Sequence, residues 1–168
     1  EFEVPVDLAS HVIGTTLAEN IFGRFKDYDN FVYVHLGPGL GAGLVIDGYV
    51  YCGTKNTVGE LGHMTVDDNG PICYCGNYGC LETVASDWAL VQQAEAAIEE
   101  GVQTHIPEHV EDEDITPMAI FHAAEIGDRL ANNLIDKSGQ YIGTALAGVV
   151  NLLAPQAIVF GGSMAEDG

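Results

Sequence analysis

The stretch Gly59-Glu60-Leu61-Gly62-His63-Met64, followed by Cys73-Tyr74-Cys75-Gly76-Asn77-Tyr78-Gly79-Cys80-Leu81-Glu82, carries most of the information about the fold. It lies in a segment, residues 52–80, that has little hydrophobic periodicity and many glycines. A loop of this length needs something other than a hydrophobic core to hold it in place. The sequence therefore predicts a local crosslink in this segment.

The crosslink that the residues favour is a bound metal ion. His63, Cys73, Cys75 and Cys80 form the pattern His-x9-Cys-x-Cys-x4-Cys. Three thiolates and one imidazole make a closed tetrahedral set for structural Zn²⁺, and the glycines let the chain turn tightly around it. A disulfide with free thiols is the alternative, and it is disfavoured because no secretion signal opens the chain. Cys52 is predicted to be an ordinary half-buried thiol.

The flanking sequence alternates between strand and helix patterns, which predicts an α/β or α+β fold. Apolar residues at 17, 18, 21, 22 and 25 are spaced for one face of a helix that ends near Gly23. Strands are expected at 31–36, 44–46, 49–51 and 157–160, with a tight turn at Asp47-Gly48. Further helices are expected at 81–100, from Thr116 onward and at about 128–153.

Composition excludes several functional classes. The 168 residues include 5 Lys and Arg against 25 Asp and Glu, a net charge of −20, so the chain itself cannot neutralise the phosphates of a nucleic acid. The same charge disfavours binding to anionic lipid, and no apolar run approaches the ~18 residues of a membrane span. Without a secretion signal, the protein is expected to be cytoplasmic. We expect the chain to be an internal piece of a longer protein.

The motifs around Gly59-Glu60-Leu61-Gly62-His63 and Cys73 to Glu82 resemble the signature of the ROK family of repressors, open reading frames and sugar kinases. The glycine loop from Gly37 and the strand end at Gly161-Gly162 resemble that family too. The resemblance implies an actin-like, ribonuclease-H-like fold of two lobes with a sugar in the cleft between them. Residues 1–30 would then be the tail of the first lobe. Residues 31–168 would form most of the second, sugar-binding and zinc-containing lobe, truncated at its C-terminal end.

The resemblance also implies that Glu60, His63 and Glu82 contact sugar hydroxyls. Carboxylates accept hydrogen bonds from hydroxyl groups, and an imidazole can bind zinc through one nitrogen and a sugar oxygen through the other. The alternative is purely structural: Glu60 as a turn residue and Glu82 as a charge on the first turn of a helix.

Two departures from the pattern of the family's kinases bear on activity. Those kinases carry an Asn-Asp pair before their first helix, whose Asp is the general base, and the pair falls on Ser10 and His11 here. Their phosphate loop reads Gly-Thr-Gly, whereas this chain reads Gly37-Pro38-Gly39. Proline has neither the N–H nor the hydroxyl through which such loops bind phosphate. No catalytic residue is therefore predicted, because His11 stands in the place of the catalytic Asp.

Three hypotheses follow from these residues. The first is the effector-binding domain of a sugar-responsive transcriptional repressor, which binds a sugar or sugar phosphate. It would contact DNA only through a helix-turn-helix outside this chain. The second is an ATP-dependent sugar kinase of the glucokinase or N-acetylhexosamine kinase type, and the third is a zinc-stabilised scaffold without a ligand. A homodimer or higher homo-oligomer is expected, with the helical stretch from Leu81 as a contact.

Overall fold

The computed structural model describes residues 4, 10–55, 57–109 and 114–166. Its elements, in chain order, are α1 (His11–Phe22), β1 (Phe31–His35), β2 (Gly41–Ile46), β3 (Tyr49–Tyr51), the short 3₁₀ helix η1 (Leu61–His63), α2 (Leu81–Ala85), α3 (Asp87–Glu99), the 3₁₀ helix η2 (Ile106–His109), α4 (Pro117–Glu125), α5 (Arg129–Leu153), β4 (Ala157–Gly161) and α6 (Ser163–Glu166). The alternation of strands and helices confirms the predicted mixed α/β class. The division into lobes at residue 30 remains a prediction.

The four strands form one sheet in the order β3-β2-β1-β4. Strand β1 pairs in parallel with β4 and antiparallel with β2. The predicted turn between β2 and β3 is confirmed: Asp47 and Gly48 both have positive φ angles, of 52° and 80°, as a tight hairpin turn requires. The strand expected at 157–160 is also confirmed, but it is not fully buried. It lies at the edge of the described sheet, where Phe160 is 49% exposed.

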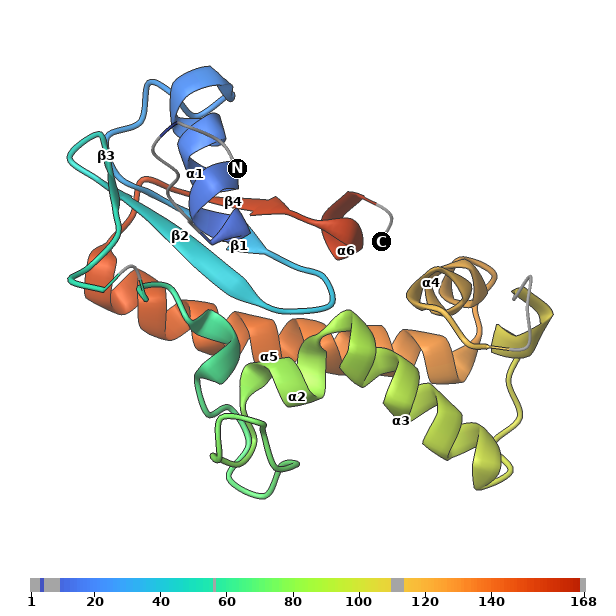
Figure 1. Ribbon diagram of the computed structural model, residues 1–168. Helices are drawn as coiled ribbons and strands as arrows, with labels where there is room; N and C mark the ends of the chain where they lie inside the picture. The colour runs from blue at the N-terminus through green and yellow to red at the C-terminus, as the bar shows by residue number, and fades with distance from the viewer. Residues whose placement is uncertain (1–3, 5–9, 56, 110–113, 167–168) are drawn as a thin grey trace.

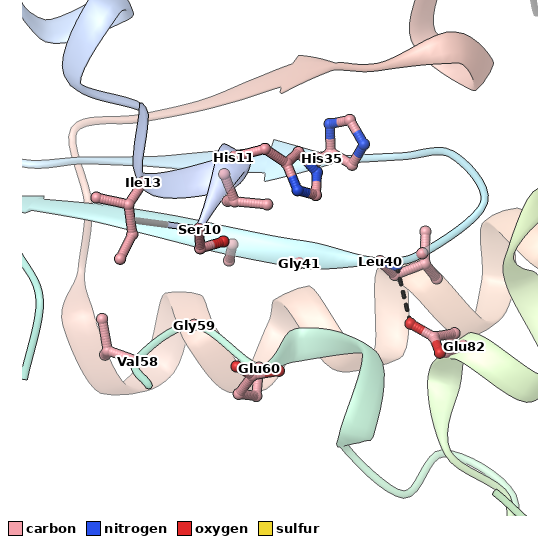
Figure 2. A pocket seen from close by; sticks show the side chains of 13 residues that line it. Ser10, His11, Ile13, His35, Leu40, Gly41, Val58, Gly59, Glu60 and Glu82 are labelled. Atoms are coloured by element: carbon pink, nitrogen blue, oxygen red, sulfur yellow. Dashed lines mark hydrogen bonds between the residues drawn. The ribbon is translucent and has the colours of Figure 1, made fainter. Parts of the chain in front are cut away.

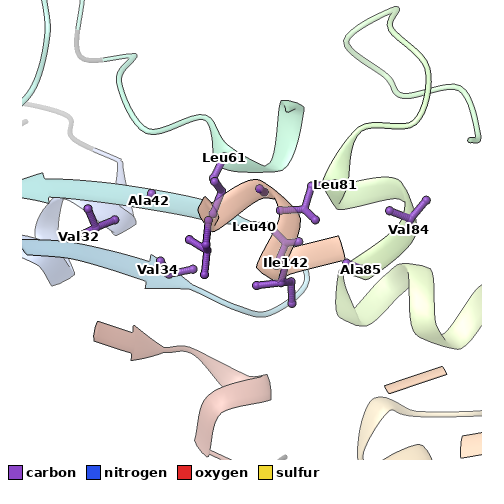
Figure 3. Close-up of a cluster of buried hydrophobic side chains, with 11 residues drawn as sticks. Val32, Val34, Leu40, Ala42, Leu61, Leu81, Val84, Ala85 and Ile142 are labelled. Carbon is purple, nitrogen blue, oxygen red and sulfur yellow. The ribbon is translucent and has the colours of Figure 1, made fainter. Parts of the chain in front are cut away.

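The two faces of the sheet are covered by different helices (Figure 1). Val32 and Val34 of β1 pack in one core cluster with residues of α2 and α5, as the close-up in Figure 3 shows. Phe31 and Tyr33, which alternate with them, pack with Val12 of α1 on the opposite face. The alternation of side chains along a strand thus gives β1 two buried faces, which explains its continuous apolar sequence.

Helix α1 lies on β2 through an unusually close contact. A Cβ atom at Gly43 would collide with the side chain of Thr16, and one at Gly41 would press on Val12. Val12 and Thr16 are accordingly the buried residues of this helix. The apolar face expected from residues 17, 21 and 22 is instead exposed here, with Phe22 84% exposed. The helix takes this orientation because the glycines of β2 admit the Thr16 side and not the bulkier apolar side.

The single helix predicted at 81–100 is two helices, α2 and α3. Ser86 separates them in an extended conformation, and its buried hydroxyl accepts a hydrogen bond from Ala89 N, which caps α3. Because the chain turns at Ser86, α2 packs in the core cluster that contains Val32 and Val34 of the sheet. Leu90 and Ala94 of α3 instead pack in a second core cluster, with residues of η2, α4 and the first half of α5. The predicted helix starts at Thr116 and Asp128 are confirmed by side-chain caps to Ala119 and Ala131.

None of the helices in the described part of the chain combines the length and apolar character needed to cross a membrane.

Candidate functional site: a sugar-sized cavity beside a metal loop

The four predicted metal ligands come together in the segment between β3 and α2. His63, Cys73, Cys75 and Cys80 each offer one ligand atom, and these atoms lie within 4.8 Å of one another. Cys73 Sγ is 3.6 Å from His63 Nδ1, and Cys75 Sγ is 3.7 Å from Cys80 Sγ. Tetrahedral coordination with zinc bond lengths requires about 3.6 Å between nitrogen and sulfur and about 3.8 Å between two sulfurs. The cluster therefore has the spacing to hold one metal ion, and all four cysteines of the chain are free thiols.

The loop around this cluster has backbone hydrogen bonds of its own, among them Val66 N to Gly79 O and Cys73 N to Asn77 O. Two isolated bridges, Thr65 with Cys80 and Ile72 with Tyr78, are its strand-like pairings. Gly79 has a positive φ angle, and a Cβ there would collide with the carbonyl of Asp67, so this turn requires glycine. One hydrogen bond, from Tyr141 Oη to Asp67 Oδ2 at 2.9 Å, ties the loop to α5. Metal ligation would add a crosslink to these hydrogen bonds.

The thiols differ in their affinity for protons. Burial is the main cause that raises the pKa of Cys80 to about 12, whereas the backbone N–H of Asn77 is the main cause that lowers the pKa of Cys75. A cation favours the thiolate form of every cysteine that ligates it. Metal binding here is therefore coupled to release of the Cys80 proton.

The segment that carries the four ligands, residues 63–80, is called the metal loop below. Next to it is a cavity of about 150 Å³ (Figure 2). Its walls are the start of α1, the end of β1, the glycine loop that leads into β2, residues 58–60, and Glu82 of α2. Glu60 and Glu82 both line this cavity, as does His11. The structure thus brings together two of the three predicted sugar contacts and His11, the residue expected in place of the kinase base.

At one end of this cavity two imidazole rings meet. His11 and His35 pack edge to face with 4.6 Å between ring centroids. Burial and then the charge of His11 lower the pKa of His35, while Asp87 opposes them. His35 Nδ1 is buried without a hydrogen-bond partner among the described residues. His11, which the resemblance to the family's kinases is expected to place where they carry a carboxylate base, thus packs against a second imidazole.

Glu82 is held in place by the glycine loop. Its Oε2 accepts a hydrogen bond from Leu40 N at 3.2 Å, which the dashed line in Figure 2 marks. The Leu40 N–H is therefore not available to bind a phosphate. Pro38 has no backbone N–H, so the loop lacks a second donor at that position. The carboxylate is thereby positioned at the cavity wall, with its other oxygen available to a ligand hydroxyl.

His63 does not line this cavity. Its Nδ1 faces Cys73, and its Nε2 lies 3.1 Å from Tyr74 Oη and 3.9 Å from Glu60 Oε2. Tyr74 was not predicted as a site residue. Its position between two cysteines of the motif was the available signal, together with a hydroxyl that can share a proton with an imidazole. Burial and then the charge of Glu82 raise the pKa of Tyr74, so its hydroxyl stays protonated at neutral pH.

The sheet, the cavity at its glycine loop and the Cys and His cluster define part of an actin-like α/β fold, with a loop that could hold a metal ion. The chain belongs to the ROK family, whose sequence profile matches residues 1–168. The predicted family and the partial actin-like fold are thereby confirmed.

Similar proteins include both regulators and kinases. The chain is 35% identical over 165 residues to the DNA-binding transcriptional dual regulator NagC of Escherichia coli strain K12, across 98% of this chain and 40% of that protein. Among solved structures, a ROK family transcriptional regulator described as a homologue of the E. coli MLC protein has a TM-score of 0.85 and 43% identity, covering 95% of this chain and 39% of that one. A ROK family glucokinase from Streptomyces griseus, in complex with glucose and AMPPNP, has a TM-score of 0.85 and 29% identity, covering 98% of this chain and 54% of that one.

These comparisons show that the chain is similar to regulators of the N-acetylglucosamine-repressor and Mlc type. The chain spans about 40% of the length of the curated relatives it matches. Because the same fold serves a glucokinase, activity has to be argued from the residues of the cavity.

Proposed function

We propose that this chain is the effector-binding part of a transcriptional repressor of the N-acetylglucosamine-repressor and xylose-repressor type, without kinase activity. The observation that carries the proposal is the packing of His11 against His35, because the resemblance to the family's kinases implies a catalytic Asp at position 11. An imidazole whose neighbour is a second imidazole is a poor substitute for an oriented carboxylate base. Loss of a positioned base typically costs about 10²–10⁴-fold in rate.

The ligand we propose is a sugar or sugar phosphate in the cavity between α1 and the metal loop. Support comes from Glu60 and Glu82, which line the same cavity from two different segments. Charge-assisted hydrogen bonds from sugar hydroxyls to carboxylates are stronger than those between neutral groups. The exposed imidazole of His11, at the far end of the cavity, would suit the phosphate group of a sugar phosphate.

The metal we propose for the four-residue cluster is zinc in a structural role. The nitrogen and sulfur spacings support a tetrahedral ion with three thiolates and one imidazole. Zinc bound there would fix the tautomer and orientation of His63. His63 would in turn hold Tyr74 and Glu60 on its Nε2 side, and Glu60 lines the cavity.

DNA binding and self-association belong to the same proposal. A chain with a net charge of −20 is unsuited to contact DNA phosphates, so contact with an operator would come from a helix-turn-helix elsewhere in the protein. Ligand binding would shift an existing equilibrium between arrangements of the lobes and thereby change how that DNA-binding part is held. The protein would act as a homodimer or higher homo-oligomer.

The test is calorimetric titration of the full-length protein with neutral and phosphorylated hexoses, pentoses and N-acetylhexosamines. Glu60→Gln and Glu82→Gln should each weaken binding of the best ligand by about 1.5–3 kcal/mol, or roughly 10- to 150-fold, because each removes a charged acceptor. Their melting temperatures should stay close to that of the wild type, since the amide oxygen introduced by Glu82→Gln can still accept from Leu40 N. Glu99→Gln, an exposed carboxylate on α3, is the matched control.

Two results would contradict the proposal. Wild-type affinity in both cavity variants would mean that the ligand lies elsewhere. Unfolding of both variants would mean that the two carboxylates are structural. His63→Ala should be more damaging than either, because it also removes a metal ligand.

A further inference from the structure

A second cavity lies on the other side of Glu82. It has a volume of about 400 Å³, within the range of small-molecule sites. It is bounded by the glycine loop at Pro38, by the metal loop, and by the start of α3. Glu82 lines both cavities, so a ligand in the first could extend past this carboxylate into the second.

Large apolar side chains surround this second cavity and are exposed to solvent. Tyr74 is 82% exposed, Ile72 66% and Trp88 59%. They come from two separate segments, the metal loop and the first turn of α3, and converge on one hollow. Single exposed apolar residues are common, but a group of them around a concave surface is typical of a binding site.

The polar groups at this cavity indicate the chemistry of its occupant. The carboxylate of Glu82 is the charged group among its lining residues, and no Lys or Arg of the described chain lines it. An anionic occupant is therefore disfavoured. Aromatic faces suit the apolar C–H face of a pyranose ring, and a carboxylate suits its hydroxyls, so the combination favours a neutral sugar over a purely apolar ligand.

We propose that the cavity between Tyr74 and Trp88 is a subsite for a second, neutral pyranose unit. The effector would then be a disaccharide or similar glycoside whose first ring occupies the cavity at Glu60 and Glu82. This inference rests on the proposed function, because it extends the ligand of the same site. Trp88 is the specificity-determining residue of the subsite, since it stands outside the metal loop and its ring is free to stack.

The test compares single sugars with their disaccharides on the full-length protein by calorimetry. The pairs are glucose with cellobiose and maltose, N-acetylglucosamine with N,N′-diacetylchitobiose, and xylose with xylobiose. At least one disaccharide should bind about tenfold more tightly than its monosaccharide, which corresponds to ~1.4 kcal/mol. Trp88→Ala should abolish that gain and leave the affinity for the monosaccharide unchanged, whereas Trp88→Phe should keep most of it.

Tyr78→Ala provides the matched control. Tyr78 is 58% exposed on the same metal loop, but it lines neither cavity. Its replacement should leave both affinities unchanged.

The outcomes separate this inference from the proposed function. If a monosaccharide binds but no disaccharide gains affinity, or if Trp88→Ala preserves the gain, the subsite is refuted while the sugar cavity stands. If no sugar of either kind binds, both the subsite and the proposed function fail.

Discussion

At the scale of single residues, the most informative contact is that of His11 with His35. Both rings belong to the wall of the candidate sugar cavity, and they come from the first residue of α1 and the last of β1. Because His35 is pressed against His11 and partly removed from water, its neutral form is favoured. We therefore expect the stability of the folded chain to depend on pH through His35.

The sign of the pH effect follows from the lowered pKa of His35. Between that pKa and the ordinary value of 6.5, the unfolded chain binds more protons than the folded one, so the free energy of unfolding falls as the pH falls. We expect His35→Gln to lose less stability than the wild type between pH 7.5 and pH 5. Urea unfolding at both pH values measures this, with His105→Gln as an exposed control.

An equal loss of stability in the wild type and in His35→Gln would contradict this assignment. An NMR titration of the His35 imidazole provides a second measurement, and its midpoint should lie below 6.5.

Sequence reasoning identified some residues of the site better than others. The metal ligands could be predicted because their spacing and chemistry are local: three cysteines and nearby glycines leave few other arrangements. Tyr74 was missed although its position between two cysteines was an available signal, and His35 and Trp88 were missed because their roles depend on residues that the fold brings near them. His35 meets a residue 24 positions earlier (35 − 11), a distance over which no spacing rule applies. The sugar contacts of Glu60, His63 and Glu82 remain predictions.

At the scale of elements, we expect the metal loop to be the segment whose order depends most on a bound ion. Removal of the metal by a chelator, or the substitution Cys75→Ser, should lower the free energy of unfolding by roughly 4 kcal/mol or more, as losses of structural metals do. Hydrogen exchange should then quicken at residues 57–82. The purified protein should contain about one zinc per chain by elemental analysis.

Cys52→Ser is the matched control for the metal loop. Cys52 lies outside the cluster, with its Sγ 3.8 Å from Val50 O, so this variant should keep both its metal and its melting temperature. A metal-free protein with an unchanged melting curve would contradict a structural role for the ion.

Two errors in the predicted elements have clear physical causes. The break at Ser86 was missed because apolar residues continue with helical spacing on both sides of it. The Ser86-Asp87 pair was the available signal of a new N-cap. The exposed apolar face of α1 was expected to pack inward. The glycines of β2 determine which side of α1 packs on the sheet, and the periodicity within the helix does not reveal this.

At the scale of the whole molecule, the question is whether the lobe takes part in phosphoryl transfer. We expect the full-length protein, with ATP, Mg²⁺ and a panel of hexoses and N-acetylhexosamines, to turn over far below the ~1–100 s⁻¹ of kinases. The triple variant Ser10→Asn, His11→Asp, Pro38→Thr should raise the rate, because it restores the base and the loop. Turnover of the wild type within the kinase range would refute the repressor proposal.

The packing of α1 on β2 also affects how the members of a family can diverge in function. Since the glycines of β2 and the buried Thr16 fix this helix against the sheet, its first residue keeps one place relative to the cavity. A substitution at position 11 therefore places the new side chain at the same point of the cavity wall, with no change in the backbone. In this way, a family that includes both glucokinases and repressors can change the side chains of the cavity by a few substitutions while the backbone stays the same.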